Sequence, residues 1–208
     1  MKTNIRQLKF SELQSFLKNH GEPIFRSKQI YRWLWKEKIT CFNEMTNLPE
    51  KLRDYLRKNF EIDYLKIKNK YLSEDGTIKF LFNLLDGNYC EGVLIPEKNR
   101  VTACISSQVG CSFSCKFCAT GQMKRIRNIM SYEIFDQVSL INDESQNIYK
   151  KPITNIVYMG MGEPLVNYQN VIESIKYITN KEGLNLSSKR ITLSTVGVSK
   201  MIKKLADE

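Results

Sequence analysis

The chain has 208 residues, 42% of them hydrophobic, which is enough for one large packed domain or two small ones and excludes wholesale disorder. Lysine and arginine number 32 against 22 acidic residues, so the formal charge of +10 favours a polyanionic partner such as nucleic acid, although a solvated basic surface would give the same count. Six cysteines beside a single histidine, His20, favour metal or redox chemistry at thiolates over sites built on histidine.

Neither an export signal nor a membrane-spanning segment is visible in the sequence. The chain starts with a mixed, polar stretch, and no apolar run approaches the roughly 18 residues of a transmembrane helix. We therefore expect a cytoplasmic protein with no membrane partner. In that reducing compartment the cysteines are not expected to form a disulfide framework.

Residues 1–60 are expected to form a small helical accessory domain. Ser11–Gln14 has the pattern of a capping box at a helix start. Apolar side chains recur at helical spacing in three segments: Leu13, Phe16 and Leu17; Ile30, Trp33 and Leu34; Leu52, Tyr55 and Leu56. The outer faces are rich in lysine and arginine, which is consistent with an RNA-binding module and equally with a solvated bundle.

Residues 61–98 change to the two-residue period of β-strands. Apolar and basic residues alternate from Leu65 to Lys68. Asp75-Gly76 and Asp86-Gly87 are two-residue hairpin signals between apolar runs. We expect a β-meander here that ends in a linker at 96–99.

Residues 99–208 alternate strand and helix patterns, which indicates an α/β fold. Strands are expected at 101–107, 155–159 and 190–195, and the helices that follow them at 131–142, 168–180 and 199–206. Ser131 is the expected cap of the first of these helices. Three β–α units imply a parallel sheet but are too few to close a barrel. We therefore expect the first three units of a partial (β/α) barrel and, because the sequence stops inside the last helix, a fragment or shortened gene product.

A compact cysteine motif follows the first of these strands. Cys111, Cys115 and Cys118 lie within eight residues on the expected loop. Thiolates are soft ligands that select zinc, copper(I) or iron–sulfur clusters. A structural zinc site needs four ligands, which Cys90 or Cys104 could complete, whereas three cysteines on a four-iron cluster would leave one iron open to a small molecule.

Two further segments lie at the carboxyl ends of the later strands, where such sheets bind ligands. Met159–Pro164 follows the second strand, and its glycines, Gly162 among them, would let the backbone approach a ligand closely. Glu163 could hold a ligand ammonium group through a charge-assisted hydrogen bond. Ser194 ends the third strand and could bind a carboxylate or ribose, or could simply cap the next helix.

The Cys-x3-Cys-x2-Cys motif in this setting resembles the radical SAM (S-adenosylmethionine) superfamily. Four longer segments resemble the RlmN/Cfr methyltransferases: Gly21–Trp33, Glu91–Cys111, Met159–Leu165 and Ser194–Gly197. The resemblance implies two cofactors, a [4Fe-4S] cluster and S-adenosylmethionine. It places the cluster on Cys111, Cys115 and Cys118, and S-adenosylmethionine on Gly162, Glu163 and Ser194.

The RlmN branch implies a radical methyltransferase that acts on C2 of an adenine in 23S rRNA and in tRNA, with flavodoxin or ferredoxin as electron donor. The ring carbon is a poor nucleophile, and radical chemistry supplied by the cofactor answers this. By resemblance, Cys104 is the thiol that releases the RNA through a disulfide, and Glu91 accepts a proton. From the residues alone, Cys104 could be a small buried hydrophobic residue and Glu91 a strand-surface acid. We expect a monomer.

Several alternatives stay open. The motifs do not separate C2 methylation from the C8 methylation of the Cfr branch, and a different radical SAM enzyme, a zinc-stabilised RNA-binding module or a decayed gene would each fit in part. The methyl-carrying cysteine of the family lies near its C-terminus and is not matched by Cys41 or Cys90, so these 208 residues are expected to bind the cluster without completing methyl transfer. The family commonly has a Gly–aromatic pair at Lys124-Arg125; the basic run Lys124–Arg127 could contact phosphate or merely alter the loop.

Overall fold

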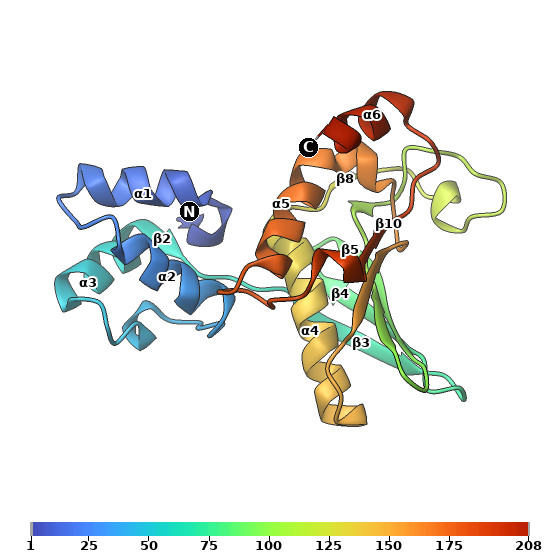
Figure 1. The fold of residues 1–208 in the computed structure, drawn as a ribbon, viewed down its shortest axis with the longest axis horizontal. Coiled ribbons are helices and arrows are strands. Elements are labelled where there is room, and N and C mark those ends of the chain that lie inside the picture. The colour runs from blue at the N-terminus through green and yellow to red at the C-terminus, as the bar shows by residue number, and fades with distance from the viewer. Residues whose placement is uncertain (1, 208) are drawn as a thin grey trace. The chain divides into compact units, whose positions relative to one another are not determined.

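The computed structural model describes residues 2–207, which divide into two compact units (Figure 1). The first unit runs to Tyr64 and also contains Asn180–Asn185, and the second contains Leu65–Thr179 and the residues from Leu186 onward. Across residues 2–207, no helix is both long and apolar enough to cross a membrane.

The first unit is helical, as its apolar spacing predicts. Its elements in chain order are β1 (Thr3–Asn4), α1 (Phe10–Asn19), α2 (Arg26–Trp35), α3 (Glu50–Asn59) and β2 (Phe60–Glu61). The helices bury their apolar faces, including Leu17, Ile30 and Leu56, each 0% exposed. β1 and β2 pair in parallel and join the two ends of the unit. The sequence does not predict this pair, because two-residue strands are too short to show a period.

A buried arginine fixes the start of this unit. Arg6 is 1% exposed, and its guanidinium lies 4.1 Å from the ring centroid of Tyr64 and 4.6 Å from that of Trp35. Its Nη1 donates to the Asp63 carbonyl at 3.1 Å. Because the aromatic faces and the carbonyl offset the desolvation of the charge, the segment before α1 is held against the segment after α3.

The second unit is built on one six-stranded sheet with the strand order β10-β9-β6-β5-β4-β3. Its strands are β3 (Lys66–Leu72), β4 (Ile78–Asn83), β5 (Tyr89–Pro96), β6 (Val101–Cys104), β9 (Asn155–Tyr158) and β10 (Ile191–Leu193). Neighbours from β3 to β6 are antiparallel, whereas β6, β9 and β10 are parallel. The predicted α/β fold with three β–α units and a preceding meander is therefore confirmed.

The meander and the parallel strands are not separated by a linker. The Glu97 N–H donates to the Arg100 carbonyl at 2.7 Å, which makes the expected linker at 96–99 a tight turn. β5 then pairs directly with β6, with Val93 opposite Cys104. The expected division into 61–98 and 99–208 therefore falls inside one sheet, because antiparallel pairing across a short turn joins the two segments.

Helices α4 (Ser131–Tyr149) and α5 (Tyr168–Thr179) lie side by side on one face of the sheet (Figure 1). α6 (Ser199–Asp207) follows β10 and completes the third β–α unit. β4 alternates accordingly: Ile78, Phe80 and Phe82 are buried, and the residues between them are exposed or half-buried. The opposite sheet face is therefore free to carry polar and reactive side chains.

The start of α4 differs from the prediction. The capping position is Met130, not Ser131, and the Met130 N–H donates to the Glu133 carboxylate at 2.9 Å. The Ser131 N–H donates instead to the Asn170 side chain at 3.2 Å. Since Asn170 lies on α5, a contact between distant segments replaces the local cap that the sequence suggests.

Candidate functional site

The cysteine motif lies on a loop that is closed at its base by a small sheet. β7 (Gln108–Val109) pairs antiparallel with β8 (Arg127–Asn128), so the chain leaves and returns at the same place. Within the loop, the Cys118 N–H donates to the Cys115 carbonyl at 3.1 Å. The backbones of Cys111 and Lys124 pair as an isolated parallel β-bridge. The cysteines thus lie on one loop after the first parallel strand, as the sequence predicts.

A cavity of about 340 Å³ lies at the carboxyl ends of the parallel strands. The structure brings six of the eight candidate residues around it: Cys111, Cys115, Cys118, Gly162, Glu163 and Ser194. Its other lining residues are Phe113, Phe117, Thr120, Tyr158, Met159, Gly160, Pro164, Thr195 and Val196. Three segments that are far apart in the sequence therefore meet at one cavity, as expected for a ligand site at this edge of a parallel sheet.

The segment after β9 packs directly against the segment after β6. Gly162 has φ +89°, and a β-carbon on it would lie 2.6 Å from Cγ of Gln108 and 2.8 Å from its backbone nitrogen. The Met161 carbonyl accepts the N–H groups of Ser107 and Gln108 at 2.9 and 3.1 Å. Only glycine satisfies both the backbone conformation and this close approach.

Glu163 joins two walls of the cavity. Its side chain is almost fully buried, and its Oε1 accepts the Leu165 N–H while its Oε2 accepts the Val196 N–H, both at 2.9 Å. The carboxylate therefore fixes the loop after β10 against the loop after β9. A carboxylate oxygen can accept more than one hydrogen bond, so the same group can also receive a ligand ammonium.

Glu91 and Cys104 lie beside the cavity rather than on its wall. Cys104 pairs with Val93 on β5 and with Val157 on β9, and Glu91 lies two residues before Val93, so both side chains point to the sheet face opposite α4. The Glu91 carboxylate forms an ion pair with Lys79 at 3.1 Å. Burial raises the pKa of the Cys104 thiol, although a hydrogen bond from the Met159 N–H opposes this.

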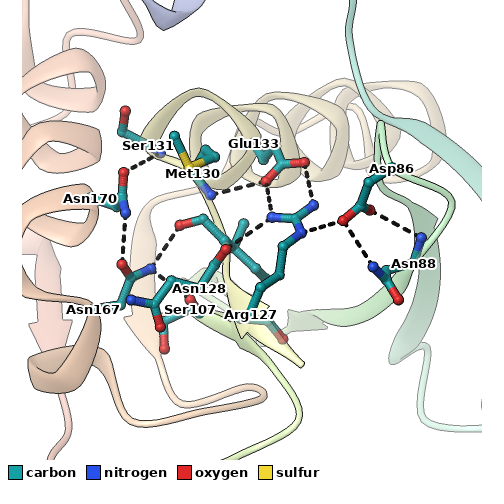
Figure 2. A network of polar contacts seen from close by, with 12 residues as sticks. Asp86, Asn88, Ser107, Arg127, Asn128, Met130, Ser131, Glu133, Asn167 and Asn170 are labelled. Atoms are coloured by element: carbon teal, nitrogen blue, oxygen red, sulfur yellow. Dashed lines mark hydrogen bonds and ion pairs between the residues drawn. The ribbon is translucent and has the colours of Figure 1, made fainter. Parts of the chain in front are cut away.

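Two buried amide side chains were not among the predicted site residues. Gln108 is fully buried; its Oε1 accepts the Glu163 N–H at 3.0 Å. The Nδ2 of Asn167 donates to the carbonyls of Ser107 and Ile129, each at 2.7 Å (Figure 2). Gln108 lies on a two-residue strand and Asn167 on a short 3-10 helix, which are too short to show a period, so neither residue could be found before the loops were placed in space.

The donor set at the cavity suits an iron–sulfur cluster. Three thiols line one wall, and thiolates are the usual ligands of such clusters. In the part of the chain that the structure describes, no three His, Cys, Asp or Glu side chains converge closely enough to hold a single metal ion. All six cysteines are free, so Cys104 forms no disulfide here.

The family model of the radical SAM superfamily matches residues 105–208, which include the cysteine loop and every segment that lines the cavity. This chain belongs to the radical SAM superfamily. A [4Fe-4S] cluster and S-adenosylmethionine are the cofactors that this membership implies, and the three thiols and the Glu163 carboxylate that line the cavity suit their chemistry. A second family model, the ribosomal RNA large subunit methyltransferase N-terminal domain, matches residues 3–62.

Similar proteins align with nearly the whole of this radical SAM chain. A relative from Cytophaga hutchinsonii, "Probable dual-specificity RNA methyltransferase RlmN", is 56% identical over 98% of the chain and 56% of its own length. A relative of the same name from Thermotoga maritima is 45% identical over 99% of the chain and 59% of its own length. The crystal structure of a radical SAM methyltransferase from Sphaerobacter thermophilus superposes with a TM-score of 0.85 at 36% identity, covering 99% of this chain and 60% of that one. The chain thus spans less than two thirds of the length of each of these three proteins.

Proposed function

We propose that this protein is a radical SAM RNA methyltransferase that methylates C2 of an adenine in 23S rRNA and in tRNA. The observation that carries the proposal is the convergence of three cysteines, Glu163 and Ser194 on one cavity. Relatives named RNA methyltransferases that are 42–56% identical over at least 94% of the chain support the RNA substrate.

The residues around the cavity have separate proposed tasks. Cys111, Cys115 and Cys118 would hold the cluster, and Gly162, Glu163 and Ser194 would orient S-adenosylmethionine against it. When bound, these cofactors would supply the one-electron chemistry that an unreactive ring carbon requires. Glu163 combines two tasks, since it orients the ligand ammonium while holding the Val196 N–H at 2.9 Å.

Cys104 and Glu91 are proposed as the catalytic residues that act on the RNA. Cys104 would be the thiol that frees the RNA from the protein, and Glu91 would accept the proton that leaves the adenine. Two features support this pairing: both side chains project from the same sheet face, and Cys104 is next to Met159, which lines the cavity. The Glu91 carboxylate also lies 3.1 Å from Nζ of Lys79, so a cation stands beside the proposed proton acceptor.

The first unit is proposed to bind the RNA backbone. A cavity of about 660 Å³ on this unit is lined by Lys2, Lys51, Asp54, Tyr55, Arg57 and Lys58. Cationic side chains beside an aromatic ring suit phosphates and unstacked bases. We further propose a monomer that receives electrons from flavodoxin or ferredoxin and, because its substrates are ribosomal and transfer RNA, works in the cytoplasm.

Anaerobic reconstitution with iron and sulfide, followed by EPR of the reduced protein, tests the cofactor site. We expect a four-iron signal that changes when S-adenosylmethionine is added and that is absent from Cys115→Ala. Cys41→Ala, which removes an exposed cysteine far from the motif in sequence, is the matched control and should retain the signal. A colourless protein with stoichiometric zinc would contradict the proposal.

The substrate is tested on RNA from cells. Inactivation of the gene should remove 2-methyladenine from 23S rRNA and tRNA, as measured by mass spectrometry of nuclease fragments. Loss of 8-methyladenine instead would show a C8 enzyme, and unchanged RNA would refute an RNA methyltransferase.

A further inference from the structure

A group of charged side chains lies at the base of the cysteine loop and has no task in the proposed chemistry. Arg127 on β8 forms a two-pronged ion pair with Glu133, Nη1 to Oε2 at 2.7 Å and Nη2 to Oε1 at 2.8 Å. Its Nε donates to Oδ2 of Asp86 at 2.5 Å (Figure 2). Arg127, Glu133 and Asp86 together form a group that we name the loop clamp.

Within the loop clamp, the Arg127–Glu133 ion pair is sheltered from solvent, whereas the Asp86 side chain is 40% exposed. The Glu133 side chain is 2% exposed and that of Arg127 is 24% exposed. Burial disfavours the charge of Arg127, but hydrogen bonds to Glu133 and Asp86 together outweigh it and raise the pKa of Arg127. The hydrogen bond from Arg127 holds the pKa of Asp86 below its usual range. Paired, half-buried charges with bidentate geometry are costly to break singly. Within the run Lys124–Arg127, which the sequence predicts either to contact phosphate or to alter the loop, Arg127 makes these internal contacts.

The clamp joins three elements that are far apart in the sequence. Glu133 also accepts the Met130 N–H at 2.9 Å and so caps α4. Asp86 lies in the turn between β4 and β5 and accepts the Asn88 N–H at 3.1 Å. Arg127 is thus anchored both to the helix that covers the sheet and to the hairpin that precedes it.

Amide side chains connect the clamp to the cavity wall. Asn128, the neighbour of Arg127 on β8, accepts a hydrogen bond from Nε2 of Gln108 at 2.8 Å. Gln108 in turn accepts the Glu163 N–H at 3.0 Å. Asn167 donates hydrogen bonds to the carbonyls of Ser107, just before β7, and Ile129, just after β8, and so joins the two ends of the loop base.

The loop between β7 and β8 leaves several of its large apolar side chains exposed. Phe117, between two of the cysteines, is 95% exposed, and Met123 and Ile126 are 50% and 62% exposed. A segment with so little burial gains little from packing, so its fixed base decides where it projects.

We propose that Arg127 is a positioning residue that, through Glu133 and Asp86, holds the returning strand of the cysteine loop so that the three thiols face the wall formed by Glu163. The proposal rests on the proposed function only in taking these thiols as cluster ligands. Loss of a group that orients a metal ligand without touching the metal typically lowers metal affinity about 10–100-fold.

The test compares Arg127→Lys and Arg127→Met with Arg100→Lys and Arg100→Met. Arg100 is a matched control in the same unit, because it forms an exposed pair with Glu97 at 2.8 Å and precedes β6, whereas the loop follows that strand. After anaerobic reconstitution of the 208-residue protein, we would measure iron and sulfide per chain, resistance of the cluster to a chelator, and the EPR change on addition of S-adenosylmethionine. Thermal unfolding reports the fold separately.

Arg127→Lys should keep the fold but lose cluster retention about tenfold, with a smaller EPR response, since an ammonium cannot bridge both carboxylates. Both Arg100 variants should match the unsubstituted protein. Should Arg127→Met fail to fold, Asp86→Asn removes only the more exposed partner and should show a weaker form of the same loss. Normal iron content and EPR response in Arg127→Lys and Asp86→Asn, whatever their melting temperatures, would overturn the positioning role.

Failure of the proposed function and failure of the positioning role of Arg127 can be told apart by experiment. A wild-type protein without a four-iron signal refutes the proposed function and leaves the clamp to be judged by hydrogen exchange of the metal-free protein. There, Arg127→Lys should speed amide exchange across 107–129 relative to Arg100→Lys. Equal exchange would refute the clamp independently of any cluster.

Discussion

Gly162 is constrained both in its backbone conformation and in the space available for a side chain. Its positive φ and its contact with Gln108 are separate constraints, because the first concerns the backbone and the second concerns the space that a β-carbon would need. Gly87 offers a comparison, since it has φ +83° but no atom within 4 Å of the corresponding position. Substitutions at Gly162 and Gly87 therefore distinguish the cost of backbone strain from the cost of overpacking.

Gly162→Ala should lower the free energy of unfolding by about 2–5 kcal/mol, the sum of left-handed strain and overpacking. Gly87→Ala should cost only the strain, about 1–2 kcal/mol. Urea unfolding followed by circular dichroism measures both. Equal losses in the two variants would mean that Gln108 moves aside.

Cys104 should react slowly with alkylating agents. Its pKa is raised by burial, so at pH 8 less of it is thiolate than of an ordinary thiol, and only the thiolate reacts. The rate at Cys104 should be lower than that at the exposed Cys41, and it should still be rising at a pH where the rate of free cysteine has levelled off. Timed iodoacetamide labelling and peptide mass spectrometry report both rates, and faster labelling of Cys104 at pH 8 would contradict the argument.

At the scale of elements, β4 shows how the sheet is held to α4. Phe80 and Phe82 are fully buried, with ring centroids 5.8 Å apart. Gly92 on β5 leaves room for them, because a β-carbon there would lie 2.7 Å from Phe82 and 3.2 Å from Ile141 of α4. The helix therefore approaches the sheet at a position where β5 has no side chain.

Phe82→Ala should destabilise the second unit by about 3–5 kcal/mol, since it leaves a cavity under α4. Leu72 lies at the end of β3 and is 71% exposed. Leu72→Ala should therefore change the free energy of unfolding by less than about 0.5 kcal/mol. Chemical denaturation of both variants provides the check. A small loss for Phe82→Ala would show that α4 can collapse onto the sheet.

At the scale of the whole molecule, charge is the property that bears on function. The excess of +10 is spread over the chain, but the cavity on the first unit gathers Lys51, Arg57 and Lys58 in one place. Cations that contact phosphates release counterions, so RNA binding should weaken as salt rises, with a slope of roughly −0.7 per phosphate on single strands.

Replacement of Lys51, Arg57 and Lys58 by Gln should weaken RNA binding and reduce the salt slope by up to about 2. Replacement of the exposed Lys98, Lys151 and Lys200 removes the same charge elsewhere and should leave the slope nearly unchanged. Fluorescence anisotropy with an RNA oligonucleotide over a salt series measures both. Equal slopes in the two triple variants would mean that the cavity does not contact RNA.

Features with a local cause could be read from the sequence. The three helices of the first unit follow from apolar spacing, the two hairpins from Asp-Gly pairs, and the three β–α units from alternating patterns. The cysteine spacing identified the loop, since ligands that are close in sequence are necessarily close in space. Each of these signals lies within a few residues of what it predicts.

Features that depend on distant segments were decided only by tertiary structure. No pattern in the sequence shows that the meander joins the parallel strands in one sheet, that Glu163 bonds Val196, or that Arg127 pairs with Glu133 and Asp86. Buried polar groups form hydrogen bonds with whichever partners packing brings close to them. These partners are distant in sequence: 33 residues separate Glu163 from Val196, and 41 separate Arg127 from Asp86. The sequence by itself therefore determined the main helices and strands and the cysteine motif, and packing of the sheet against α4 and α5 determined how the loops around the cavity are held.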